Sequence, residues 1–160
     1  MAISENDMAK AQEVYENLCT TLSEADLKYE REDEELKIVF TLYGEDIPMK
    51  FVVYINPAQY CIRLISWLPF EIVEAKMVDA AVVTCAINQQ LGMGTFMFDI
   101  ADGSVGFKLV QSYMDSEIGK DLLLFMISIS QHIVDRYNDK YLMLSKGNLS
   151  LKDFLAEINQ

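Results

Sequence analysis

The fold of this chain is decided by residues 36–67, LKIVFTLYGEDIPMKFVVYINPAQYCIRLISW. Apolar and polar residues alternate through this stretch with a period of two, which is typical of β-strands with one buried face. The alternation is interrupted at residues 44–46 (GED) and at Asn56-Pro57, which favour turns. Because both turns are short, residues 36–42, 49–55 and 60 up to Pro69 are predicted to form an antiparallel meander.

Helical patterns flank this meander on both sides. Apolar residues recur every three or four positions in 7–23, in 71–91, and from Ser116 to about Asp139. Asp102-Gly103 predicts a tight hairpin between strands 95–100 and 104–111. A short last helix is expected after Asn148 or Ser150. The acidic run Glu30–Glu35 is predicted to be a turn or a ragged edge strand.

The predicted fold class is α+β. An antiparallel five-stranded sheet carries helices on one face, in the order α-βββ-α-ββ-α plus a short C-terminal helix. The 160 residues fit one domain, 1–160, and no linker divides them. Its core is expected over about 7–140, with 141–160 as a helical tail. The 51% of hydrophobic residues excludes general disorder.

The charge is strongly acidic. Asp and Glu number 25 against 13 Lys and Arg, for a formal net charge of −12. Such a surface repels phosphate backbones and anionic lipid headgroups, so neither nucleic acid nor a membrane is an expected partner. Residues 1–35 hold eleven acids and three bases, and hence −8 of this charge. That segment is either a solvated helix face with an acidic turn or an attraction for a basic partner.

The cysteines and the N-terminal residues favour a cytoplasmic protein. The first residues lack the basic start and apolar run of a secretory signal. Cys19, Cys61 and Cys85 are widely separated among apolar neighbours, so they are expected to be small buried core residues of a reduced protein. The chain has one His. We therefore expect neither a zinc site nor any other metal or cofactor.

The outward face of the sheet is unusually apolar. If the in-phase residues face the helices, the alternate residues must face away. These outward residues include the candidate partner-binding residues Val39, Val52, Tyr54, Arg63, Ile65 and Trp67, and the bases Lys37, Lys50 and Lys108.

Three interpretations of this face remain open: an ordinary exposed surface, a docking surface for protein, and a surface that binds single-stranded nucleic acid. The net charge opposes the third. Burial of five or six such side chains at ~25 cal/mol per Å² favours docking of a protein, although association entropy offsets much of that gain.

Helix 71–91 offers a second candidate surface. Val78, Val82 and Cys85 lie along one side of it, and Ala80, Ala81 and Val83 make its other sides apolar too. We expect this helix or the outward sheet face to form a homodimer.

No pattern of catalytic residues is found. His132 and Asp135 have helical spacing, but no Ser or Cys is tied to them. Asp99 and Asp102 flank a hairpin turn, and turn chemistry explains Asp102 without catalysis. Gly92-Met93-Gly94 follows a helix and precedes a strand, which is the reverse of a dinucleotide-binding loop.

Residues 87–90 (INQQ), 94–99 (GTFMFD) and 102–107 (DGSVGF) place an Asn at a helix end, a Gly before a strand and Asp-Gly in a hairpin. This pattern resembles that of the YbjN-like family, whose members are labelled sensory transduction regulators of bacteria and whose fold looks like that of type III secretion chaperones. The resemblance implies a secretion-chaperone-like fold and a non-enzymatic binding or regulatory module. It implies structural roles for Asn88, Gly94, Asp102 and Gly103.

The expected function is therefore a non-enzymatic protein-binding module with a chaperone-like or regulatory role. Its partners are expected to be a second copy of the chain, a client polypeptide, or both. The alternative is a small-molecule-binding or enzymatic domain whose site is assembled from distant residues.

Overall fold

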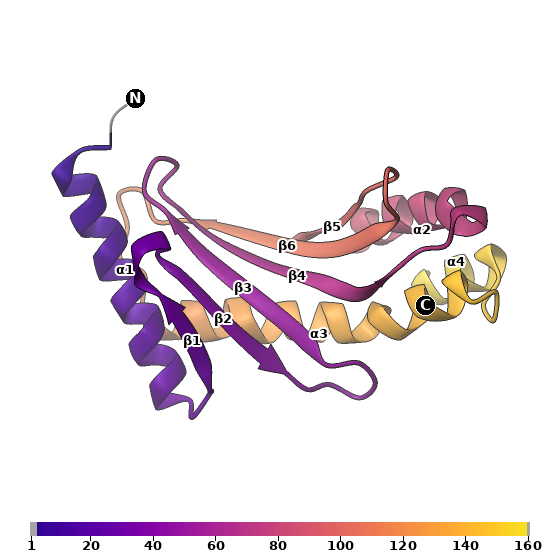
Figure 1. Cartoon of the computed structure of the whole chain (residues 1–160), viewed down its shortest axis with the longest axis horizontal. Coiled ribbons are helices and arrows are strands. Elements are labelled where there is room, and N and C mark those ends of the chain that lie inside the picture. The colour runs from indigo at the N-terminus through magenta and orange to yellow at the C-terminus, as the bar shows by residue number, and fades with distance from the viewer. Residues whose placement is uncertain (1–2, 160) are drawn as a thin grey trace.

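The computed structural model describes residues 3–159 of the chain. Its helices are α1 (Glu5–Glu24), α2 (Met77–Gln90), α3 (Lys120–Ser145) and α4 (Leu151–Ile158). Its strands are β1 (Tyr29–Glu32), β2 (Lys37–Leu42), β3 (Met49–Asn56), β4 (Cys61–Glu71), β5 (Thr95–Phe98) and β6 (Ser104–Ser112). They form one antiparallel sheet in the order β1-β2-β3-β4-β6-β5 (Figure 1). The α+β class with an antiparallel sheet is confirmed.

The sheet has six strands where five were predicted. The extra strand, β1, comes from the start of the acidic run, and a 3₁₀ helix follows at Asp33–Glu35. Two side chains fasten β1 to α1: the Tyr29 hydroxyl donates to the Cys19 carbonyl at 3.0 Å, and Arg31 contacts Glu16 at 2.8 Å. Of the two alternatives for the acidic run, the edge strand is therefore correct for Tyr29–Glu32.

The helix predicted from residue 71 begins later. β4 continues to Glu71, which pairs with Ser104, and a 3₁₀ turn at Glu74–Lys76 precedes α2 at Met77. Between Trp67 and Glu71 the register of β4 against β6 shifts. Pro69 lies in that irregular stretch, where its missing N–H costs no regular ladder hydrogen bond. The strand therefore continues past the proline, with its pairing to β6 irregular between Trp67 and Glu71.

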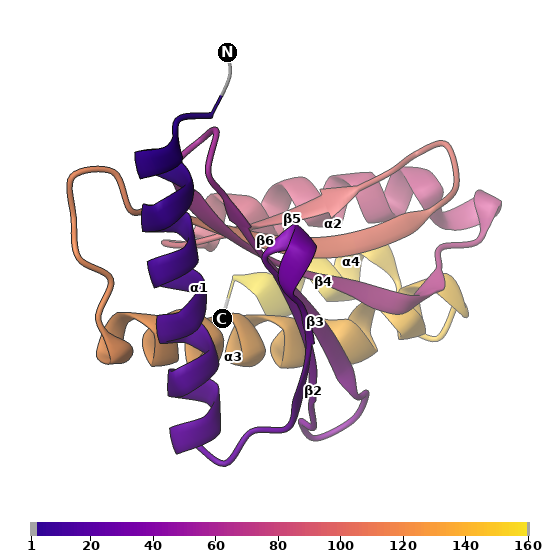
Figure 2. The ribbon, with the colours of Figure 1, turned by 60° about the vertical axis from the view of Figure 1, so that its left-hand side comes forward.

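The helices lie at one side of the sheet and bury its in-phase residues, as expected. Figures 1 and 2 show α3 running the length of the molecule, with α1 crossing it near its start. The Nζ atom of Lys120 lies 2.6 Å from Glu24 at this crossing. Fully buried residues of the sheet side include Ile38, Phe51, Ile62, Val105 and Phe107.

The C-terminal residues belong to the same core. α3 extends to Ser145, beyond the predicted end near residue 139, so Tyr141 lies inside this helix and not in a separate tail. The ring of Tyr141 lies 5.6 Å from that of Phe96 in β5 and 5.7 Å from that of Phe154 in α4, centroid to centroid. Both Tyr141 and Phe154 are fully buried. Residues 141–158 therefore help to build the interior.

The cysteines are divided between the core and the surface. Cys19 and Cys61 are buried, as predicted, whereas Cys85 is exposed, so that part of the prediction was wrong. The reason is the orientation of α2, which buries Ala80, Val83 and Ile87 and turns Cys85 away from the core.

Candidate functional site

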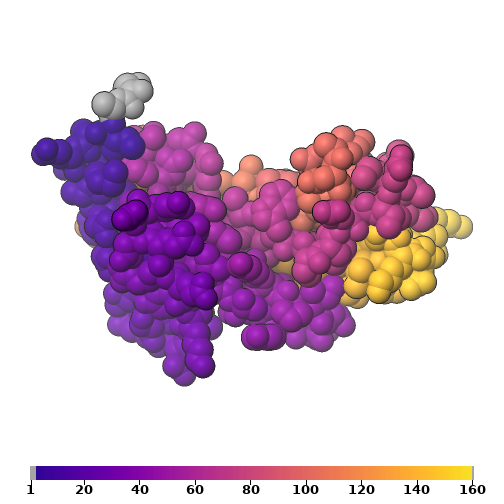
Figure 3. All heavy atoms as spheres, in the orientation of Figure 1, coloured from indigo at the N-terminus to yellow at the C-terminus, as the bar shows by residue number. Residues whose placement is uncertain are grey.

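The outward face of the sheet brings together all six candidate partner-binding residues. Cross-strand pairing aligns one row across the strands β1, β2, β3, β4, β6 and β5: Glu30, Val39, Val52, Ile65, Lys108 and Thr95. The neighbouring row is Glu32, Lys37, Tyr54, Arg63 and Val110. Figure 1 views this side, with α3 behind the strands, and in Figure 3 none of the helices α1 to α4 lies over the centre of the face. The face is therefore a continuous surface.

Solvent reaches much of this face. Val39, Val52, Tyr54, Arg63 and Ile65 are half-buried by one another, and Trp67 is 48% exposed. Cys61, which shares their phase at the start of β4, is buried instead. The centre of the face is thus apolar and accessible, with its one indole at the end near the β5–β6 hairpin.

One of the bases on this face, Lys37, is neutralised by acids of β1 and of the 3₁₀ helix that follows it. Lys37 lies 2.5 Å from Glu32 and 3.3 Å from Glu35, and these carboxylates raise the pKa of its ammonium group. Its Nζ atom also lies 5.9 Å from the centre of the Tyr54 ring. Arg63 donates to the side chain of Gln59. The acids were missed as members of this face, although the alternation Tyr29-Glu30-Arg31-Glu32 is visible in the sequence.

Trp67 is positioned by a glycine on the next strand. Trp67 pairs with Gly106, which pairs with Met97. A Cβ atom at position 106 would lie 2.6 Å from Cε3 of the indole. The ring therefore lies flat against β6 only because residue 106 has no side chain.

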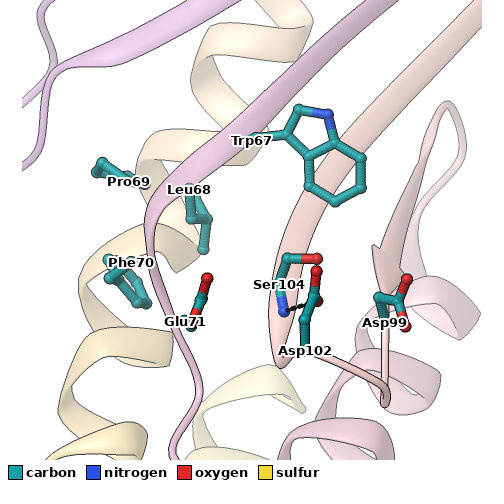
Figure 4. A pocket seen from close by; sticks show the side chains of 8 residues that line it. All are labelled: Trp67, Leu68, Pro69, Phe70, Glu71, Asp99, Asp102 and Ser104. Carbon is teal, nitrogen blue, oxygen red and sulfur yellow. Dashed lines mark hydrogen bonds between the residues drawn. The ribbon is translucent and has the colours of Figure 1, made fainter.

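Beside Trp67 lies an open pocket of about 680 Å³, lined by Trp67, Leu68, Pro69, Phe70, Glu71, Asp99, Asp102 and Ser104 (Figure 4). Asp99 and Asp102, considered above as a carboxylate pair, meet here, and β4 adds Glu71. One oxygen of Asp102 accepts the Ser104 N–H at 2.8 Å, and one of Asp99 accepts the Ala101 N–H at 2.8 Å. Hydrogen bonds from Ser104 lower the pKa of Asp102, so its carboxylate is charged at neutral pH.

The α2 residues Val78, Val82 and Cys85 share an exposed stripe. Val78 is 71% exposed and Val82 is 42% exposed. A shallow hollow of about 530 Å³ lies beside them, where Phe98 of β5 meets Ala81 and Cys85. This contribution of Phe98 was not expected, because only the hairpin's tertiary position brings it to α2.

The four residues of the family pattern have defined contacts. The Asn88 carboxamide accepts the Phe96 N–H at 2.8 Å and donates to the Phe96 carbonyl at 2.9 Å. It thus bonds both backbone groups of Phe96, in the way that the backbone of a paired strand does. At Gly94, where φ is +71°, a Cβ atom would lie 2.2 Å from the Phe107 ring. Gly103 has a φ of +79° and packs against Ile72, and Asp102 closes the same turn.

His132 and Asp135 do not form a pair. His132 is exposed, and the Asp135 carboxylate accepts the backbone N–H of Glu45 at 3.1 Å, which holds the β2–β3 loop on α3. Within residues 3–159 there is no group of three His, Cys, Asp or Glu side chains placed to hold a metal. No helix in that same range is long and apolar enough to span a bilayer.

The family model described as "YbjN: Putative bacterial sensory transduction regulator" matches residues 15–142. The chain belongs to the YbjN family. The predicted family is thereby confirmed, and the match includes the acidic run at 30–35 as well as most of α3. No curated protein is similar enough to count as a match.

Two solved structures are similar in fold. The crystal structure of YbjN, "a putative transcription regulator from E. coli", has a TM-score of 0.60 at 12% identity, covering 77% of this chain and 87% of that one. It supports the fold of the family. A chain of the ExsC–ExsE complex has a TM-score of 0.44 at 13% identity, covering 79% of this chain and 93% of that one. That second likeness is too distant to support an argument.

Proposed function

We propose that this YbjN-family chain is a non-enzymatic protein-binding module of the cytoplasm with a regulatory or chaperone-like role. The family description, a sensory transduction regulator, supports the regulatory part. Within residues 3–159 the one His–Asp candidate is not assembled, because Asp135 accepts the Glu45 N–H and shares no hydrogen bond with His132.

The observation that carries the proposal is the uncovered outward sheet face. Val39, Val52 and Ile65 adjoin one another across three strands, and Trp67 is half-exposed at their end. Covering apolar surface stabilises a complex by about 25 cal/mol per Å², and aromatic residues and Arg dominate the energies of protein interfaces. A polypeptide partner fits this broad face better than a small molecule does.

The α2 stripe is proposed to bind a second copy of the chain. Val78, Val82 and Cys85 leave an apolar ridge on α2, and the hollow beside Phe98 can receive part of the same ridge from a partner. Such a two-fold contact would leave the outward sheet face for another polypeptide.

Light scattering of purified variants tests this arrangement. We expect a concentration-dependent mass of twice the monomer for wild type and for Trp67→Asp, and the monomer mass for Val82→Asp, because an aspartate would be buried at the dimer contact. Ser128→Asp, at an exposed position of α3, is the matched control and should keep the dimer.

The outward face is tested by chemical cross-linking followed by mass spectrometry in cells that express each variant. A polypeptide cross-linked to wild type and to Ser128→Asp should be lost from Trp67→Asp and Ile65→Asp. If none of the Asp substitutions changes either the mass or the cross-linked partner, the proposed function is wrong.

A further inference from the structure

The pocket beside Trp67 is both aromatic and acidic. It combines a half-exposed indole with the carboxylates of Glu71, Asp99 and Asp102, and no Lys or Arg of residues 3–159 lines it. Figure 4 shows the indole above the three carboxylates, with Asp102 between Glu71 and Asp99. The residues come from β4 and from the β5–β6 hairpin, so tertiary structure alone gathers them.

The three pocket carboxylates are not neutralised by a base in the described part of the chain. Glu16, Glu24, Glu32 and Asp79 each lie within 4 Å of a basic nitrogen, whereas within the described residues none of the three pocket carboxylates has such a partner. The Glu71 carboxylate has no hydrogen bond there either, while Asp99 and Asp102 are held in place by the hairpin backbone. Three carboxylates beside an aromatic face, two of them held by the backbone, attract a cation that also has a flat or apolar surface.

We propose that this pocket binds the guanidinium or ammonium group of an Arg or Lys side chain on a protein partner. A guanidinium group suits it best, because its plane stacks on an indole while its N–H groups donate to carboxylates. The inference rests on the proposed function and deepens it: Trp67 belongs both to the pocket and to the outward face, so a polypeptide lying on Ile65 can place a basic side chain there.

The chain provides its own reporter for this site, since Trp67 is its single tryptophan. Titration with acetylated tri-arginine amide should change the tryptophan fluorescence in a saturable way. The isosteric tri-citrulline amide, which lacks the charge, should not. In Glu71→Gln/Asp99→Asn/Asp102→Asn, affinity for tri-arginine should fall by at least about tenfold, since three charge-assisted contacts are lost together.

The variant is chosen to preserve the hairpin, because an Asn side-chain oxygen can accept the same backbone N–H as Asp. Its matched control is Glu34→Gln/Glu45→Gln/Glu117→Gln, which removes the same charge at exposed positions outside the pocket. This control should bind tri-arginine like wild type. Equal weakening in both variants would show diffuse attraction and would overturn the proposal.

Further outcomes would also contradict it. Equal binding of tri-citrulline would show that charge is not required. Unchanged fluorescence on addition of tri-arginine would show that the peptide does not bind beside Trp67. Binding of spermidine as tight as that of tri-arginine would assign the pocket to small organic cations and not to a partner side chain. Val82→Asp keeps Trp67, so its fluorescence measures tri-arginine binding independently of dimerisation and of partner cross-linking. A failure of the proposed function can therefore be distinguished from a failure of the pocket proposal.

Discussion

The missing Cβ atom of Gly106 determines where the Trp67 ring lies. The indole occupies the space that a side chain at position 106 would take, with only 2.6 Å between its Cε3 atom and an added Cβ. On the helix side, Tyr15, Arg31 and Asp33 form a cluster in which the Tyr15 hydroxyl donates to Asp33 at 2.7 Å and Arg31 contacts the same oxygen at 2.8 Å. Substitutions at Gly106 and at Asp33 therefore test these two arrangements.

We expect Gly106→Ala to displace the Trp67 ring. The added methyl group should shift the tryptophan emission and lower the free energy of unfolding by about 1–3 kcal/mol, the usual effect of overpacking. Urea unfolding followed by circular dichroism, together with emission spectra, measures both. Gly92→Ala is the control, since no atom in the described part of the chain (residues 3–159) lies within 4 Å of its added Cβ. An unchanged spectrum for Gly106→Ala would contradict this placement of the indole.

Asp33 predicts a pH dependence of stability. Its pKa is lowered from the ordinary 3.8, first by Arg31 and then by the Tyr15 hydroxyl. Because the pKa of Asp33 is lower in the folded state than in the unfolded state, its carboxylate stabilises the folded protein at pH values above the unfolded-state pKa. This stabilisation is lost as the pH falls through the folded-state pKa. Asp33→Asn should therefore be less stable than wild type at pH 7, and the difference should shrink below a pH of about 4. Unfolding midpoints measured across that range test it; a constant difference would contradict it.

At the scale of elements, the two edges of the sheet are protected differently. β1 is short and carries Glu30 and Glu32, charges that discourage pairing with another chain. At the other edge, α2 lies beside β5 and Asn88 bonds both backbone groups of Phe96. Asn88 thus supplies hydrogen bonds on the side of β5 that faces away from β6, its one strand neighbour among residues 3–159.

Asn88→Ala should weaken this edge. It leaves the N–H and carbonyl of Phe96 without their side-chain partner, which costs about 1–3 kcal/mol of unfolding free energy. Hydrogen exchange at Phe96 should also become faster. Gln89→Ala, at the exposed neighbouring position, should change stability little. Equal stability of the two variants would show that Asn88 is dispensable for the edge.

α4 is expected to be required for a stable core. Phe154 is fully buried against Tyr141. Truncation in Phe154→Ala should cost about 3–5 kcal/mol, as for other buried Phe residues. Thermal unfolding beside Lys152→Ala, an exposed position of the same helix, measures the effect. A melting temperature like that of the control would mean that α4 is an accessory tail.

At the scale of the whole molecule, both the net charge of −12 and the charge pattern of the outward face argue against nucleic acid as a partner. Of the four bases of that face, Lys37 is paired with Glu32 and Glu35, and Glu30 adds a further negative charge on β1. The face therefore lacks the continuous positive surface that a nucleic-acid backbone needs, while its Trp67 end is acidic.

We expect no saturable binding of fluorescently labelled oligothymidylate at ~0.15 M salt, because the field of the protein opposes a phosphate backbone. Fluorescence anisotropy measures this directly, with a single-stranded DNA-binding protein as the positive control. Binding that weakens steeply as salt is added would contradict the expectation and favour a nucleic-acid role.

The sequence by itself determined the local periodicities: the meander at 36–67, the Asp-Gly hairpin, the helices and the set of residues that share the outward face. These follow from side-chain alternation and turn chemistry, which act between neighbours in the chain. Only the tertiary structure decided that Tyr29–Glu32 pairs as a sixth strand, that Cys85 turns outward, and that Glu71 joins Asp99 and Asp102 beside Trp67. Each of these depends on a contact between residues far apart in sequence, such as Arg31 with Glu16 or Trp67 with Gly106, and periodicity carries no information about such contacts.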